Sequence, residues 1–106
     1  MARRQTQDIT AIIYDKKGRV LSIGKNSYIK THPMQARHAN KVGRPEKIYL
    51  HAEMQAIIKC KQLDKAHKIL VTRITKKGRY GNARPCPVCQ SAIDEAGIKN
   101  IEWTND

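Results

Sequence analysis

Residues 85–103 read PCPVCQSAIDEAGIKNIEW, and the order of residue types in this segment predicts a helix followed by a strand. Pro87 suits the start of the helix, because the fixed φ angle of proline matches the first helical position. Gly97 suits its end, because many helices close on a glycine in the left-handed conformation. The residues that follow, Ile98–Trp103, have the composition of a short strand.

The same order, a helix and then a strand, is expected earlier in the chain. From Leu50 to about Lys65 the apolar residues follow helical spacing. His67–Thr75 contains the run Ile-Leu-Val-Thr-Arg-Ile, whose β-branched residues predict a strand. Two such units in succession favour a layered α/β domain.

The first quarter of the chain predicts two strands joined by a turn. Ile9–Tyr14 and Val20–Asn26 have strand composition, and the polar turn between them includes Gly18, which can adopt a positive φ angle. The long basic segment that follows is expected to contain a short helix that begins at Pro33 and is closed by Gly43. The predicted order is β-β-α-β-α-β, with both main helices packed on one sheet, in a single domain of residues 1–106.

The composition narrows the class of protein. None of the apolar runs in the 106 residues approaches the roughly 20 residues that a membrane-spanning helix needs. The N-terminus also lacks the apolar region of a signal peptide, so we expect a cytoplasmic protein with no membrane partner. Three cysteines, two of them only three residues apart, favour a metal site in a reducing compartment over a disulfide framework.

The net charge of +12 is the strongest feature of the composition. A charge of this size favours a partner that carries phosphate, and that partner could be a free nucleotide or a nucleic acid. The alternative is a solvated basic surface that serves only to keep the protein in solution.

Two short motifs, His51-x-Glu53 and Cys86-x-x-Cys89, each stand at the beginning of a predicted helix. Side chains in the first turn lean back toward the helix start, so His51 and Glu53 can face the same space. The two cysteines are one helical turn apart and therefore share a face. One imidazole and two thiolates would hold Zn²⁺ and leave its fourth position open for water, as in a catalytic zinc site.

Glu53 lies too close to His51 along the chain to be a comfortable fourth ligand, and a carboxylate beside an activated water suits proton transfer. The alternative is a closed structural zinc site with a fourth protein ligand. Cys60 lies nine residues beyond His51, about half a turn out of phase on a helix, so we expect it to face away from the metal. The spacing of the other histidines does not favour them as ligands; they are His32, His38 and His67.

The combined pattern resembles the signature of the cytidine deaminase superfamily. The resemblance extends from Ile9 to Trp103 and is greatest to the deoxycytidylate deaminase branch, through the segments HAE at 51–53 and AGIKNI at 96–101. It implies a three-layer-type cytidine deaminase-like fold with a mixed sheet, trimmed at both ends, and a bound zinc ion. A trimmed fold leaves surfaces uncovered, so we expect a homo-oligomer, a dimer or larger.

The resemblance also implies roles for individual residues. It implies that His51, Cys86 and Cys89 hold the metal and that Glu53 is the catalytic residue. Asn26 would hydrogen-bond the sugar or the base, although a turn-forming asparagine is an equal alternative. The backbone of Ala52 would contact the edge of the base. Candidates for holding a phosphate, each of which could instead be a solvated surface charge, are Arg37, His38, Lys41 and Arg44.

Three functions are compatible with these observations. The first is hydrolytic deamination of a cytosine nucleotide, most simply dCMP to dUMP with release of ammonia. The second is deamination of cytosine or adenine in single-stranded DNA or in RNA such as tRNA, which the charge favours and the low aromatic content of 5% disfavours. The aromatic residues that could stack on bases are Tyr28, Tyr49 and Tyr80. The third is a catalytically silent binding module stabilised by zinc, which would have no use for Glu53.

Overall fold

The computed structural model describes residues 8–27, 31–43, 51–75 and 77–105. Its elements in chain order are β1 (Asp8–Tyr14), β2 (Val20–Lys25), α1 (Pro33–Lys41), α2 (Ala52–Lys59), the short 3₁₀ turn η1 (Leu63–Lys65), β3 (Lys68–Ile74), α3 (Pro87–Ala96) and β4 (Asn100–Trp103). None of the helices in the described ranges is long and apolar enough to cross a membrane.

The four strands form one mixed sheet in the order β2-β1-β3-β4. β1 is antiparallel to both β2 and β3, whereas β3 and β4 are parallel. A parallel pair needs a long crossover, and α3 supplies it between β3 and β4. The mixed sheet with its helices confirms the predicted α/β fold class.

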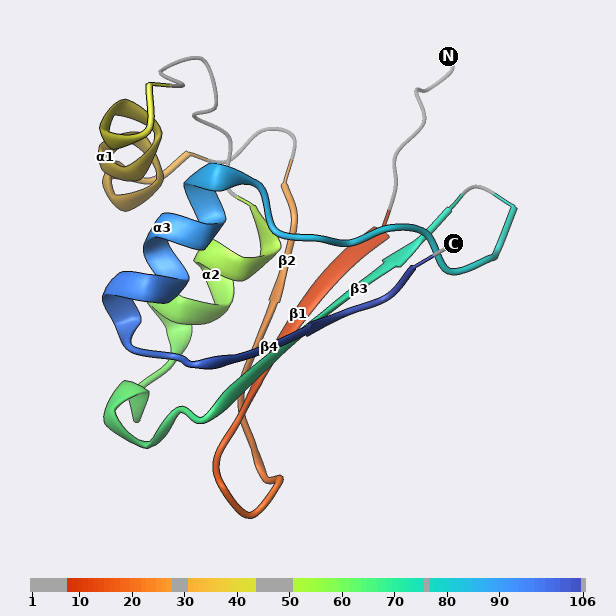
Figure 1. Ribbon diagram of the computed structural model, residues 1–106, viewed down its shortest axis with the longest axis horizontal. Coiled ribbons are helices and arrows are strands. Elements are labelled where there is room, and N and C mark those ends of the chain that lie inside the picture. Colours follow the sequence, from red (N-terminus) through yellow and green to blue (C-terminus); the bar gives the residue numbers. More distant parts are fainter. Residues whose placement is uncertain (1–7, 28–30, 44–50, 76, 106) are drawn as a thin grey trace.

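The helices lie on one face of the sheet (Figure 1). α2 packs on β1 and β2, α3 packs beside α2, and α1 lies against α3. Alternate residues of the two central strands point into this helical layer, so Ala11 and Ile13 of β1 and Ile69 and Val71 of β3 are fully buried. Helical residues complete the core, among them Met54, Ile57, Val88, Ala92 and Ile93.

α2 is held unusually close to the edge strand β2. Gly24 faces α2, and a Cβ atom added there would lie 2.9 Å from the Cα of Ala56 and closer still to backbone atoms of Ala52 and Ala56. Two hydrogen bonds fix the same contact: the Ser22 hydroxyl donates to the Ala56 carbonyl at 2.8 Å, and the Lys25 N–H donates to the Gln55 side-chain oxygen at 2.8 Å. The position of α2 on the sheet is therefore set by backbone approach and by polar contacts.

The predicted elements are present, with differences at their ends. The helix expected to run to about Lys65 ends at Lys59, where Cys60 adopts an extended backbone conformation and the chain turns through η1 toward β3. Leu50, its expected start, lies outside the described residues. The short helix from Pro33 is confirmed, and it is capped by His32, whose Nδ1 accepts from the Met34 N–H at 3.0 Å.

The last helix ends as predicted. Gly97 adopts φ +79° at the end of α3, and the N–H of the buried Ile98 donates to the Ile93 carbonyl. β4 therefore begins at Asn100, two residues later than the sequence indicated.

Candidate metal centre and substrate pocket

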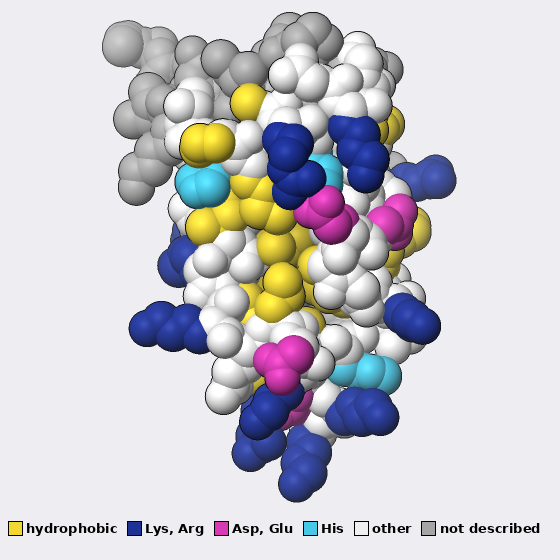
Figure 2. All heavy atoms as spheres, turned by 90° about the vertical axis from the view of Figure 1, so that its left-hand side faces the viewer, with side chains coloured by type: hydrophobic (Ala, Val, Ile, Leu, Met, Phe, Trp, Pro, Cys, Tyr) yellow, Lys and Arg dark blue, Asp and Glu magenta, His cyan; other side chains and the backbone are white. Residues whose placement is uncertain are grey.

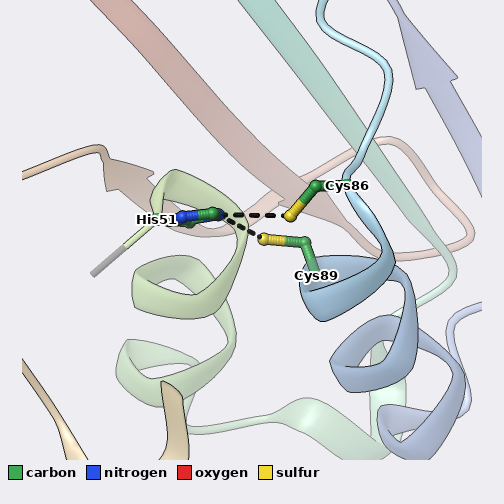
Figure 3. Close-up of side chains that lie close together, drawn as sticks. All are labelled: His51, Cys86 and Cys89. Atoms are coloured by element: carbon green, nitrogen blue, oxygen red, sulfur yellow. Dashed lines mark hydrogen bonds between the residues drawn. The ribbon is translucent and has the colours of Figure 1, made fainter. Parts of the chain in front are cut away.

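The starts of two helices meet beside the end of the sheet where β3 finishes. His51 is the residue immediately before α2, with extended backbone angles of φ −83° and ψ 159°. Cys86 occupies the equivalent position before α3, and Cys89 lies in the first turn of that helix. Figure 3 shows the imidazole of His51 pointing across the gap toward both sulfur atoms.

The three side chains form a compact donor set. The Nδ1 atom of His51 lies 3.2 Å from the Sγ of Cys89 and 3.4 Å from the Sγ of Cys86. Their ligand atoms all lie within 4.8 Å of one another. Tetrahedral zinc bonds of about 2.3 Å to sulfur and about 2.0 Å to nitrogen would separate N and S by about 3.5 Å. The observed spacing fits zinc with little adjustment.

The two thiols interact strongly with each other. The pKa of Cys86 is lowered to about 3, first because Cys89 donates a hydrogen bond to its sulfur and further because His51 does so. The pKa of Cys89 is raised, by that same hydrogen bond and by burial. The lowered pKa favours the thiolate form of Cys86. A divalent metal held by both sulfur atoms would displace the thiol proton of Cys89 as well.

Glu53 is a buried acid beside this donor set. Its side chain is only 6% exposed, and burial raises its pKa above the usual value. It lines a cavity of about 350 Å³ together with His51 and Cys86. A carboxyl group whose proton affinity is raised, next to a candidate metal centre, is suited to accept and return a proton during a reaction.

The cavity brings together several residues singled out from the sequence. Asn26 and Ala52 line it alongside Glu53. Asn26 also ties the ends of the first two strands, because its side-chain oxygen accepts from the Ile9 N–H at 3.2 Å. The remaining described residues of the lining are Ile9, Ser27, Arg73, Asn82, Ala83 and Arg84.

The residues predicted to hold a phosphate lie elsewhere or are not described. Arg37 makes two hydrogen bonds to the Glu95 carboxylate, at 2.9 and 2.7 Å, and the fully buried His38 contacts Glu95 and Ser91. These contacts join α1 to α3, because that face of α1 packs on α3. Lys41 ends α1 and is not among the described residues that line the cavity, and Arg44 lies outside the described ranges.

Arg73 and Arg84 are cavity residues that the sequence analysis did not single out. Ile69, Val71 and Arg73 occupy alternate positions of β3, and this face of the strand packs against the helices. An arginine on an otherwise apolar, buried face is the sequence feature that could have identified Arg73 as a site residue. Arg84 lies just before the cysteine motif, and its guanidinium stands 6.0 Å from the centre of the Trp103 ring. The cavity therefore has two cationic side chains at its wall.

The alternative of a closed zinc site has no fourth ligand among the residues that the structure describes. The candidate cluster contains His51, Cys86 and Cys89 and excludes Cys60, which packs against the core at the end of α2. His32 caps α1, and the side chain of His67 contacts Asn100 at 3.2 Å.

The fold and the site define a class: an α/β domain with a candidate metal centre between two helix starts and a buried acid beside it. The family model described as the cytidine and deoxycytidylate deaminase zinc-binding region matches residues 2–104, and the chain belongs to this family. No curated protein matches the chain.

Proposed function

We propose that this protein is a zinc-dependent hydrolytic deaminase that converts a cytosine nucleotide, such as dCMP, to the uracil nucleotide and ammonia. The observation that carries the proposal is the presence of the buried Glu53 in one cavity with two of the candidate metal ligands, His51 and Cys86. A silent zinc-binding module would gain nothing from a buried acid at that position, because burial of an ionisable group costs stability.

The proposed metal ligands are the Nδ1 of His51 and the sulfur atoms of Cys86 and Cys89. Zinc bound there would act as a Lewis acid toward water at its open fourth position. The positive ends of two helices support this arrangement, since they favour the thiolate forms of both cysteines.

Glu53 would carry the protons of the reaction. Its carboxylate accepts a proton from the attacking water, and the resulting carboxylic acid protonates the ring nitrogen next to the carbon under attack. It then takes the proton of the new C–O–H group and gives it to the amino group, which leaves as ammonia when the C–N bond breaks. Cytosine and water become uracil and ammonia, and Glu53 returns to its starting state.

The substrate would lie in the cavity of about 350 Å³. We assign the side chain of Asn26 to the sugar or the base and the backbone of Ala52 to the base edge, as the family resemblance implies. The phosphate is assigned to Arg73 and Arg84, because these arginines line the cavity and their planar guanidinium groups suit phosphate oxygens. Arg37 and His38 are less suited, since their polar atoms contact α3.

A Glu53→Gln variant tests the mechanism. The variant should bind one zinc ion per chain, since no proposed ligand changes, and its release of ammonia from dCMP should fall by at least about 100-fold. Glu102→Gln is a matched control, because Glu102 is exposed on β4. Normal turnover by the Glu53 variant, or absence of zinc from the native protein, would rule out the proposal.

We retain the expectation of a homo-oligomer in a reducing compartment such as the cytoplasm. Apolar side chains form a band between basic ones on the helical face (Figure 2), and the edge strand β2 exposes Val20 and Ile23 by 53% and 45%. Uncovered apolar surface of this kind supports self-association. All three cysteines are free, which suits a reducing compartment. Light scattering at several protein concentrations would measure the oligomer.

A further inference from the structure

An extended segment leads from the turn after β3 to the metal-binding start of α3, and its residues alternate regularly in burial. Gly81, Ala83 and Pro85 are buried, whereas Tyr80, Asn82 and Arg84 are exposed. In an extended chain, alternate side chains point to the same side. The three exposed side chains therefore form a row on one side of the segment.

This row begins in the cavity and continues beyond it. Asn82 and Arg84 line the cavity that contains Glu53. Tyr80 is the next member of the row, and its Cα lies at most about 7 Å from that of Asn82, the reach of two extended residues. Its side chain is 60% exposed, the highest exposure of any large hydrophobic side chain in the described ranges. An exposed aromatic side chain thus lies two residues along the chain from the cavity-lining Asn82.

The backbone of the row is held firmly. The Gly81 N–H donates to the Arg73 carbonyl at 2.8 Å, and Tyr80 forms a bridge with Ile74. Thr104 completes the support, because its hydroxyl donates to the Gly81 carbonyl at 2.8 Å and its carbonyl accepts from the Ala83 N–H at 2.9 Å. The exposure of Tyr80 is therefore a property of a positioned segment.

The surroundings of the row are cationic. Residues 77–84 read KGRYGNAR, with three basic residues and no acidic one. Lys77 and Arg79 are exposed in the turn, and Arg73 adds a guanidinium whose buried Nε has no hydrogen-bond partner among the described residues. Arg73 and Arg84 can serve a phosphate on the target nucleotide, whereas Lys77, Arg79 and Tyr80 are not among the described residues that line the cavity.

We propose that the row from Tyr80 to Arg84 binds the nucleotides next to the target base in a single-stranded nucleic acid. An exposed aromatic ring beside cationic side chains is the combination that binds single strands, in which bases stack on the ring and phosphates contact Lys and Arg. A base already outside a duplex also enters a deaminase pocket without the cost of unstacking. This inference rests on the proposed deaminase function for the identity of the target base, and it makes an oligonucleotide a better substrate than dCMP.

The first test measures binding, which needs no turnover. A fluorescent single-stranded DNA of nine nucleotides with one central cytosine, and the same sequence as RNA, are titrated with zinc-loaded protein. Tyr80→Ala should weaken binding by about 5- to 150-fold, the effect of losing one base–aromatic stack, and Tyr80→Phe should restore most of it. Arg79→Gln should reduce the slope of log affinity against log salt by about 0.7, the value for one lost phosphate contact.

Lys17→Gln is the matched control for charge. Lys17 is exposed in the turn between β1 and β2, at the opposite end of the sheet from the cavity. This variant should bind the oligonucleotide with the affinity and the salt dependence of the native protein. Equal losses in Lys17→Gln and Arg79→Gln would show that the whole basic surface attracts nucleic acid without a defined path, and would overturn the inference.

The second test compares turnover of two substrates. Ammonia release from the oligonucleotide, relative to that from dCMP, should be lower in Tyr80→Ala than in the native protein, because dCMP is too short to use the row. Oligonucleotide binding unaffected by Tyr80→Ala would refute the inference even if dCMP is deaminated. Conversely, Tyr80-dependent binding without deamination of either substrate would refute the proposed deaminase function and leave the binding row in place.

Discussion

Replacement of Gly24 by alanine should both destabilise the protein and disturb its metal centre. The new Cβ would lie 2.9 Å from the Cα of Ala56, with two backbone atoms of α2 closer still. Ordinary carbon contacts need about 3.5–4.0 Å, so α2 must move away from β2 by roughly 1 Å. The backbone of α2 cannot rotate aside as a side chain can. We therefore expect a loss of stability at the upper end of the range for overpacked cores, about 3 kcal/mol. The lower entropy of the unfolded alanine chain offsets up to about 1 kcal/mol of this loss.

Urea unfolding measures the effect directly. With a slope of about 1.5–2 kcal/mol per molar urea for a chain of this size, a net loss of about 2–3 kcal/mol lowers the midpoint by roughly 1–2 M. Zinc affinity should also fall, because His51 stands at the start of the displaced helix. The control is Gly97→Ala, because a Cβ added at Gly97 has no atom within 4 Å, although φ is +79°. Backbone strain of about 1–2 kcal/mol should therefore lower the stability of this variant. Its zinc affinity should be unchanged. A Gly24→Ala protein with native stability and native zinc affinity would refute the packing argument.

Two further predictions concern the metal and the α1–α3 contact. Zinc at 100 times its dissociation constant should raise the free energy of unfolding of the native protein by about 2.7 kcal/mol. Cys60→Ala should show the same increase, whereas Cys86→Ala should lose most of it. Equal increases in the two variants would contradict the ligand assignment. The pKa of Glu95 is lowered to about 2, first by its hydrogen bonds to Arg37. Because the folded-state pKa lies below the ordinary value of 4.5, the contact contributes stability above about pH 4.5 and loses it as the pH falls toward 2. The free energy of unfolding, measured between pH 4.5 and 2, should therefore depend less on pH in Arg37→Gln than in the native protein. An unchanged dependence would contradict the pairing of Arg37 with Glu95.

The sequence was most informative where its signals are local. Pro87 and Gly97 mark the two ends of α3 because a fixed φ and a left-handed φ are properties of single residues. The motifs at His51 and Cys86 could be placed near each other because both stand at helix starts. The early end of α2 had no such marker, since no glycine or proline interrupts the pattern between Cys60 and Lys65.

The rest of the site depends on which segments lie side by side. Arg73 belongs to the cavity because its strand position faces the helices at the end of the sheet, and the register of β3 is needed to see this. The close approach of Gly24 to α2 likewise depends on the packing of segments about 30 residues apart, for which no local pattern exists. Arg37 and His38 were plausible phosphate ligands as isolated residues, yet the packing of α1 directs them toward Glu95.

The candidate metal centre has a consequence for how variants of this protein should be interpreted. His51 and Cys86 are 35 residues apart in the chain, so an ion that grips both would act as a removable cross-link between α2 and α3. A covalent link across a loop of this size restricts the unfolded chain by about 4 kcal/mol in the chain-entropy model, and a strong metal bridge acts in the same sense. Loss of any ligand would then loosen the scaffold and abolish the chemistry together, whereas a change at Glu53 would remove the proton transfer and leave the metal bridge in place.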